Sequence, residues 1–350
     1  MAYWNIMKTK YRLVRAYLLI VILILMALTG PMGCGASEDK KHTRTMLIMD
    51  TQVDITYYHP SAQVAQTEMA KIFAEMQRLE NILSRHITGS DLQRINEAAG
   101  AVPVEVNPET LSVLRSALEF AELSDGAFDP TVAPLLELWG FGGDSPAVPT
   151  DEELVQAREL VNYRLVEMDV DKGTVFLPVV GMQLDLGGIA KGYIVDQGQK
   201  LARETATANF INAGGDISTG GRKPTGEDWR VAVQHPQNRD RLLAIITMEE
   251  GSVATSGDYQ RYFEVEGVRY HHILDPHTGM PADELTSVTV VAADTMTADA
   301  ISTAIFVLGG EKGIALVERL PAVDAIVVDY SGVPIYTSGL EGQVEIITED

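Results

Sequence analysis

The spacing of apolar and polar residues along this 350-residue chain predicts an alternation of helices and strands. In residues 61–83 the apolar side chains recur every three or four positions, which is the pattern of an amphipathic helix with one face in a core. Further helices are expected at residues 107–123, where Asn107 and Pro108 are typical of a helix start, at residues 154–161 behind a capping box of Thr150 and Glu153, and at residues 295–309.

Between these helices, short runs rich in β-branched residues predict strands. They lie at residues 164–168, 174–177, 229–233, 242–248 and 287–292, and residues 261–274 are expected to form a hairpin that turns at Glu266 and Gly267. No repeat of fixed period occurs. The expected fold class is therefore α+β: a single mixed domain, residues 46–350, with largely antiparallel sheets and packed helices.

The N-terminal residues carry a different signal. Residues 8–15 supply positive charge without any acid, and an apolar run follows at residues 17–28. This run is shorter than the roughly 20 residues that a membrane span needs, so it is typical of an export signal. We therefore expect residues 1–33 to be a signal peptide.

Cys34 is the only cysteine of the chain and stands directly behind Gly33 at the end of this signal, so no internal disulfide can form. The arrangement resembles the lipobox of bacterial lipoproteins, from which Pro31 and Met32 depart. We expect Cys34 to be lipidated and residues 34–45 to be a polar tether. The alternative is an uncleaved signal anchor in which Cys34 is incidental; both readings place the domain outside the cytoplasm at a membrane surface.

The net charge of −22 limits the possible partners. Nucleic acid is excluded as a probable ligand class because binding a polyanion depends on clustered Lys and Arg side chains. A substrate that carries phosphate would need local help from a metal ion or from backbone amides.

Two stretches combine glycine, acid and aromatic residues in a way that a core does not require. At residues 124–142 the turn of Ala127, Phe128 and Asp129 presents an aromatic ring and a carboxylate together, although a capped connection alone would also explain it. Residues 184–196 are expected to run from a strand that ends at Asp185, through the glycines 187 and 188, into a helix that begins near Ile189. Such a turn exposes free amides to an anion, and Lys191 adds a positive charge there.

The next two stretches lie further along the chain. Residues 209–221 predict a buried strand that ends in two glycines and Asp216, which either caps the turn or contacts a ligand. Residues 254–281 contain the expected hairpin, which brings His271 and His272 back toward Thr255 and Ser256. Because strand side chains alternate between faces, the two histidines cannot both be core residues.

The apolar helix at residues 295–309 contains Asp299 and Thr303, which share one face because they are four positions apart. A carboxylate among apolar residues needs a partner. Hard oxygen ligands for magnesium are one explanation, and a capping interaction at the helix start is the other.

Taken together and in this order, these stretches resemble the ApbE family of FAD:protein FMN transferases, whose architecture is T-fold-like. The resemblance runs from about Ile48 to Ile346, nearly all of the chain behind the expected signal. Met49, Asp50 and Thr51 stand where the family has Met-Gly-Thr, and His272 and Ile273 match the start of its HIxDPxTG stretch.

The resemblance implies the following roles. FAD, as the substrate, would be contacted by Met49, His86, Ala127, Phe128, Asp129, Asp185, Lys191, Ser256 and Ile273, with Thr255 nearby. His86 stands where relatives have an aromatic residue beside the flavin. Mg²⁺ would be held by the Gly188 carbonyl, Asp299 and Thr303, and His272 would be the general base.

The implied reaction is attack of a Ser or Thr hydroxyl of a target flavoprotein on the FMN phosphorus of FAD, with release of AMP. The expected acceptors are membrane-associated redox flavoproteins, and the expected location is the extracytoplasmic face of the bacterial cytoplasmic membrane, through a lipid anchor. Two alternatives stay open: an FAD pyrophosphatase that uses water as acceptor, and a non-catalytic lipoprotein that stores FAD.

Overall fold

The structure is a computed structural model that describes residues 38–347 apart from 142, 144, 145 and 239, together with the single residues 7, 15 and 17. The expected signal peptide and Cys34 lie outside the described residues. The chain divides into two units after Glu38, and the second unit, Asp39–Asp350, is described here by itself. In the described ranges, no helix combines the length and the apolar composition that a bilayer crossing needs.

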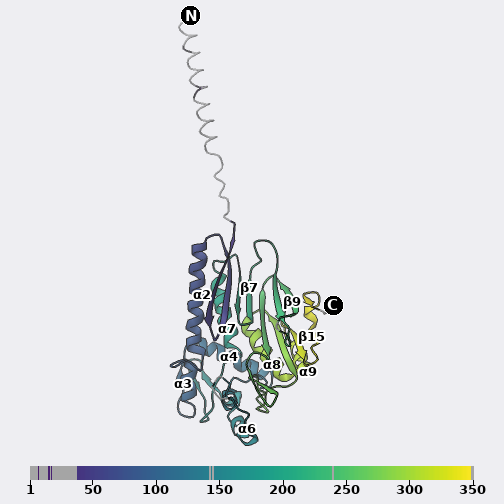
Figure 1. The fold of residues 1–350 in the computed structure, drawn as a ribbon. Coiled ribbons are helices and arrows are strands. Elements are labelled where there is room, and N and C mark those ends of the chain that lie inside the picture. Colours follow the sequence, from purple (N-terminus) through teal and green to yellow (C-terminus); the bar gives the residue numbers. More distant parts are fainter. Residues whose placement is uncertain are drawn as a thin grey trace. The chain divides into compact units, whose positions relative to one another are not determined.

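An eight-stranded antiparallel sheet forms the centre of this unit (Figure 1). Strands that are consecutive in the chain pair as hairpins at residues 40–59, 208–220 and 324–336, while longer connections bring these hairpins and the remaining strands together. In spatial order the strands are β1 (Lys40–Ile48), β2 (Thr51–His59), β6 (Ala208–Ala213), β7 (Asp216–Gly220), β10 (Gly251–Gly257), β13 (Leu285–Ala292), β14 (Asp324–Asp329) and β15 (Pro334–Tyr336).

The two faces of this sheet pack against different layers, because successive side chains of a strand point to opposite faces. In β6, for example, Ile211 joins a core with the helices, whereas Phe210 packs into a core with a second sheet. The helices are α2 (Ala62–Leu83), α4 (Pro108–Leu123), α7 (Ala190–Ala202), α8 (Thr295–Leu308) and α9 (Gly310–Val317), and the second sheet contains β16 (Val344–Ile346), β9 (Leu242–Met248) and β8 (Trp229–Gln234).

Shorter elements complete the unit. The hairpin of β11 and β12 turns at Glu266 and Gly267 as predicted, and both residues have positive φ. The remaining elements are α3 (Asp91–Glu97), β3 (Val104–Glu105), α5 (Ala133–Leu138), α6 (Asp151–Arg158), η1 (Tyr163–Leu165), β4 (Glu167–Asp169), β5 (Thr174–Phe176), β11 (Tyr262–Val265), β12 (Val268–His271) and η2 (Ser338–Leu340).

The predicted helices are present, with small shifts at their ends. Helix α6 begins and ends three residues earlier than expected, although its capping box of Thr150 and Glu153 is present as predicted. The expected strand at residues 164–168 is largely wrong, because only its last residues join a strand. The Asn162 side chain accepts a hydrogen bond from the Arg164 amide at 3.1 Å and starts a 3-10 turn instead.

The boundary of the tether is also corrected. Residues 40–45, expected to be part of the tether, belong to β1 and pair with β2 along its whole length. Their polar sequence (KKHTRT) reflects the position of β1 at the edge of the sheet, where charged side chains oppose pairing with other chains. The folded unit therefore begins near Asp39 and not at Met46.

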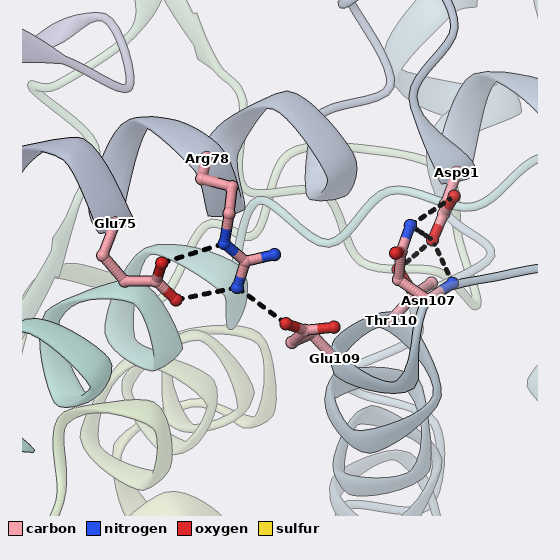
Figure 2. A network of polar contacts seen from close by, with 6 residues as sticks. All are labelled: Glu75, Arg78, Asp91, Asn107, Glu109 and Thr110. Atoms are coloured by element: carbon pink, nitrogen blue, oxygen red, sulfur yellow. Dashed lines mark hydrogen bonds and ion pairs between the residues drawn. The ribbon is translucent and has the colours of Figure 1, made fainter.

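A polar network joins the starts of α3 and α4 (Figure 2). The buried Asp91 carboxylate accepts hydrogen bonds from the Asn107 amide at 2.7 Å, from the Asn107 side chain and from the Thr110 hydroxyl at 2.6 Å. Asn107 precedes α4 as predicted, but its side chain binds Asp91 and does not cap its own helix. Beside this network, Arg78 of α2 pairs with Glu75 and Glu109.

Candidate active site

A pocket of about 750 Å³ opens where the loops between α8, α7 and the central strands meet. Its wall contains every residue that the sequence singled out for substrate, metal or base. These residues are Met49, His86, Ala127, Phe128, Asp129, Asp185, Gly188, Lys191, Thr255, Ser256, His272, Ile273, Asp299 and Thr303.

Helix α8 brings Asp299 and Thr303 to the pocket. The helix begins behind Asp294, whose side chain accepts a hydrogen bond from the Thr297 amide at 2.8 Å. The Asp299 carboxylate accepts a hydrogen bond from the Gly192 amide at 3.0 Å, and so joins α8 to α7. A Cβ atom at Gly188 would lie 3.2 Å from the Thr303 hydroxyl and 3.2 Å from the Phe128 ring, so the turn before α7 fits closely only as glycine.

Ser256 of β10 lies next to this helix face. Its hydroxyl is 2.8 Å from the Ser302 hydroxyl and 3.5 Å from that of Thr303. The neighbouring Thr255 side chain contacts Thr289 on β13 at 2.9 Å. Ser256 is therefore held against α8 on the side of the predicted metal ligands.

Lys191 lies in the pocket wall, but its charge is paired within the chain. Its ammonium forms an ion pair of 2.7 Å with the carboxylate of Asp216, a buried residue of β7. Burial alone would lower the pKa of Lys191, but the carboxylates of Asp216 and Asp299 raise it, so the lysine stays protonated. The positive charge expected at this turn is present, and within the chain it is shared with Asp216.

The sequence left open whether Asp216 caps a turn or contacts a ligand, and the structure places its carboxylate against Lys191. Its carboxyl lies beside that of Asp299, and burial raises the pKa of both groups; burial and the Asp216 charge raise the pKa of Asp299 to about 8. The signal in the sequence was an acid directly behind a glycine pair at a strand start, which fits a turn equally well. Across the described part of the chain, no three His, Cys, Asp or Glu side chains gather as a metal-binding group.

Asp185 lies in an extended segment and not at the end of a strand, which corrects the prediction. Its amide donates to the Pro130 carbonyl at 2.8 Å, so no ladder hydrogen bond is available for a sheet. Its carboxylate accepts from the Gly187 amide at 2.6 Å and pairs with Arg85 at 2.6 Å. Helix α7 begins directly behind this turn, at Ala190, as expected.

All three residues of the turn at 127–129 line the pocket, but the carboxylate of Asp129 is also bound within the chain. Asp129 is buried, and its carboxylate accepts hydrogen bonds from the amide and the hydroxyl of Thr131 and from the Tyr163 amide at 3.2 Å. The interpretation of a capped connection therefore holds for the carboxylate. Phe128 and Ala127 remain along the pocket wall.

Met49 occupies the turn between β1 and β2. Met49 and Asp50 have φ values of 57° and 54°, the left-handed conformation that a two-residue hairpin turn requires. Aspartate tolerates this conformation better than most residues, so Asp50 keeps the backbone geometry that the family's glycine would provide. The Met49 amide donates to the Glu80 carboxylate at 3.0 Å and fixes the turn against α2.

The two adjacent histidines separate as predicted. The buried His271 ring contacts the Ala282 carbonyl at 2.8 Å and packs edge-on against Phe306. His272 faces the pocket, and its Nδ1 lies 3.2 Å from the Arg261 carbonyl. Because a carbonyl can only accept, Nδ1 carries the proton and Nε2 keeps its lone pair.

The electrostatics of both pocket histidines favour the neutral ring. Burial, and then the charge of Arg261, lower the pKa of His272 to about 4. Burial and the neighbouring Arg85 also lower the pKa of His86. His272 is therefore an acceptor at neutral pH, and a weaker base than an unperturbed imidazole.

Comparison with known proteins identifies close relatives of this chain. The model of the ApbE family matches residues 49–327. The FAD:protein FMN transferase of Treponema pallidum is 37% identical over 319 residues, 85% of this chain and 88% of that protein. The solved ApbE protein of Thermotoga maritima is 38% identical, with a TM-score of 0.81 over 87% of this chain and 99% of its own. The flavin transferase ApbE from Vibrio cholerae is 30% identical, with a TM-score of 0.79 over the same shares, and the expected fold class is confirmed.

Proposed function

Because this chain belongs to the ApbE family, we propose that its pocket binds FAD and that the protein transfers the FMN half of FAD to a Ser or Thr hydroxyl, with release of AMP. The chain is an enzyme, and flavin transfer from FAD to a protein is the reaction for which its curated relatives are named. The release of AMP, the dependence on Mg²⁺ and the roles of single residues are the parts that this proposal adds.

One observation carries the proposal: a single pocket gathers, from segments far apart in the sequence, the residues to which the family resemblance gives a role with FAD, Mg²⁺ or the base. Its volume of about 750 Å³ lies within the range of roughly 300–1,000 Å³ typical of cofactor sites. We assign Met49 and His86 to the flavin end, and Ala127, Phe128 and Ile273 to the remainder of FAD. The carboxylates of Asp129 and Asp185 support the turns of this wall.

A divalent cation fits the arrangement around α8. The Gly188 carbonyl, Asp299 and Thr303 would hold it, an all-oxygen set of the kind that Mg²⁺ prefers. Support comes from the burial of Asp299 and from the neighbouring Asp216 charge, which together raise the pKa of Asp299; a cation beside this carboxyl would favour its ionised form. When bound, the ion would offset charge on the pyrophosphate.

His272 supplies the base in this scheme. The acceptor hydroxyl oxygen attacks the FMN phosphorus, its proton passes to Nε2 of His272, and the bond to the AMP phosphate breaks with its electron pair on the departing oxygen. The hydrogen bond between Nδ1 and the Arg261 carbonyl holds the ring in the tautomer that this step needs. Ser256 and Thr303 line the same side of the pocket and would position the phosphate end of the substrate.

We place the enzyme outside the cytoplasm, attached to the membrane through a lipid on Cys34. The support is the charge and apolar run of residues 8–28 together with the position of this lone cysteine. The acceptors would then be flavoproteins of membrane-associated redox systems, since their hydroxyls must reach the same surface.

The proposal is tested by the stoichiometry of the products. The protein is incubated with FAD, Mg²⁺ and a purified apoflavoprotein from a membrane redox system, and AMP is compared with FMN that stays attached to denatured acceptor. Equal amounts are expected, with neither product when Mg²⁺ is removed. AMP with free FMN would identify a pyrophosphatase, and intact FAD would identify a storage protein.

A further inference from the structure

The basic side chains of the pocket wall differ in whether their charge is already paired. They are Arg85, Lys191 and Arg261 among the described residues. Arg85 pairs with Asp185 at 2.6 Å and Glu137 at 3.0 Å, and Lys191 pairs with Asp216. No described carboxylate lies within 4.0 Å of the Arg261 guanidinium, which is exposed at the pocket. Arg261 is thus the cation of this wall whose charge is available to a ligand.

The main chain at Arg261 is held firmly. Its carbonyl accepts a hydrogen bond from the His272 amide at 3.1 Å and contacts the His272 ring at 3.2 Å. The preceding residue, Gln260, donates from its side chain to the Thr255 carbonyl at 2.9 Å. The guanidinium therefore projects from a backbone that is fixed against His272, and both side chains line the same pocket.

The charge of Arg261 also reaches across the pocket. Burial is the main reason why the pKa of His272 and of His86 is low, and the positive charge of Arg261 lowers both further. The other charged or titratable groups that act on His272 are His271 and Asp185. The charge of Arg261 therefore acts on both histidines of the pocket wall.

We infer that the Arg261 guanidinium binds the pyrophosphate of FAD and offsets the charge that remains on AMP when the phosphorus–oxygen bond breaks. A guanidinium is suited to this because it stays charged and can donate two parallel hydrogen bonds to phosphate oxygens. The chain has a net charge of −22, and the pocket wall contains the acids Asp185 and Asp299, so an anionic substrate needs an unpaired cation. The inference rests on the proposed function and assigns a substrate contact to a residue of the stretch 254–281 to which the sequence analysis gave no role.

The step balances without a further reactant. The new bond joins the acceptor oxygen to the FMN phosphorus, and the bond from that phosphorus to the bridging oxygen of AMP breaks. The proton of the hydroxyl goes to Nε2 of His272, while the electron pair stays on the AMP phosphate. Arg261 gains an interaction as this negative charge develops, which is the condition for accelerating the step.

The direct test is a binding comparison at fixed Mg²⁺. Titration calorimetry measures FAD, ADP, adenosine and riboflavin on the wild-type protein, Arg261→Gln and Arg261→Lys. Arg261→Gln is expected to weaken FAD and ADP by about ten- to a hundredfold, as for loss of a charged hydrogen bond, and to leave adenosine and riboflavin unchanged. Arg261→Lys should recover part of the loss, because the charge remains without the fork geometry.

A matched control lies on the paired strand of the same hairpin. Arg269 pairs with Glu264 at 3.6 Å and is absent from the pocket wall, so Arg269→Gln should bind all four compounds as the wild type does. Unchanged binding of FAD and ADP by Arg261→Gln would overturn the inference. An equal loss for adenosine and riboflavin would also overturn it, because it would indicate a damaged pocket.

These outcomes separate the inference from the proposed function. If the wild-type protein bound no FAD, the proposed function itself would fail. A second readout is the pH dependence of kcat/KM, whose acid limb should move to higher pH in Arg261→Gln because the charge that lowers the pKa of His272 is gone. If the acid limb of kcat/KM stayed at the same pH in Arg261→Gln, the guanidinium would lie too far from His272 to affect its pKa. That result would contradict the placement of Arg261 at the reacting phosphates.

Discussion

At the scale of single residues, the chemistry of the pocket depends on which polar side chains of its wall have no hydrogen-bond or ion-pair partner among the described residues. Asp129 and Lys191 stand in the motifs, yet hydrogen bonds and an ion pair commit their side chains to neighbours in the chain. Nε2 of His272 and the Arg261 guanidinium keep no such partner among the described residues. The chemistry therefore falls to these two groups and to the oxygen atoms around Asp299.

The low pKa of His272 has a kinetic consequence. The ring must be neutral to accept a proton, and burial followed by the Arg261 charge lower its pKa from 6.5 to about 4. Protonation, and with it loss of the base, therefore occurs only as the pH falls toward 4. We expect the acid limb of kcat/KM, which reports the free enzyme, to lie near pH 4. A limb near 6.5 that disappears in His272→Gln would show that the ring is not shielded as the structure indicates.

Asp299 offers a test of the metal site. Asp299→Ala removes a carboxylate ligand without removing a large core side chain, so we expect Mg²⁺-stimulated FAD turnover to fall about a hundredfold or more. Thermal unfolding should still be cooperative. The matched control is Asp294→Ala at the start of the same helix, which removes a cap worth about 1 kcal/mol and should leave the Mg²⁺ response intact. An Asp299→Ala enzyme with an unchanged Mg²⁺ response would refute the assignment.

At the scale of elements, the network of Figure 2 joins α3 to α4 through the buried Asp91. Asp91→Ala leaves the Asn107 and Thr110 donors without their acceptor, so we expect the free energy of unfolding to fall by roughly 2 to 3 kcal/mol. The exposed pair of Arg78 and Glu109 gives the control, because Glu109→Ala should cost less than about 1 kcal/mol. Chemical denaturation of both variants measures these differences.

The pH dependence of this network follows from its hydrogen bonds. Burial alone would raise the pKa of Asp91, but the bonds from Thr110 and Asn107 lower it below 3.8. The ionised group therefore contributes stability above that value, and the contribution is lost as the pH falls through the lower folded-state pKa. The difference between the wild type and Asp91→Ala should accordingly shrink in acid. A difference that stays constant from pH 7 to below pH 3 would contradict this account.

Elements whose apolar residues recur with a clear period could be predicted from the sequence. Elements whose position depends on side-chain hydrogen bonds could not. Helix α2 shows its three-and-four spacing, and β9 was expected with its observed bounds, because their burial patterns are local. The 3-10 turn at Tyr163–Leu165 depends on one hydrogen bond to the Asn162 side chain. Strand β1 is an edge strand with polar and charged residues, so its sequence lacks the alternation of apolar and polar residues that predicts a strand. Sequence periodicity does not record either cause.

The candidate site could be predicted as a set of residues but not as a set of contacts. The motifs named residues that line the pocket because most of them combine glycine with an acid, a hydroxyl or an imidazole near the end of an element. They did not reveal that Asp216 neutralises Lys191, since the partners lie on β7 and α7 and meet only in the folded unit. Nor did they single out Arg261, whose importance depends on the pairing of the other basic residues.

At the scale of the whole molecule, the proposed attachment to the membrane rests on the sequence of residues 1–37. Replacing Cys34 with Ser should stop lipid attachment and signal cleavage, so fractionation of cells is expected to show a precursor of higher mass. Radiolabelled palmitate should be incorporated only into the wild-type protein. A Cys34→Ser protein that is processed at the same place and stays membrane-bound would remove the lipid anchor from the account.

The central claim is that this pocket moves FMN from FAD onto a protein hydroxyl, with His272 as the base. The most direct measurement is the intact mass of an acceptor flavoprotein after incubation with FAD, Mg²⁺ and either the wild-type enzyme or His272→Ala. The account predicts a mass increase of one FMN less one water with the wild type, and about 10²- to 10⁴-fold slower labelling by His272→Ala at FAD binding that is nearly unchanged. An acceptor that keeps its mass while FAD is consumed, or equally fast labelling by both enzymes, would contradict it.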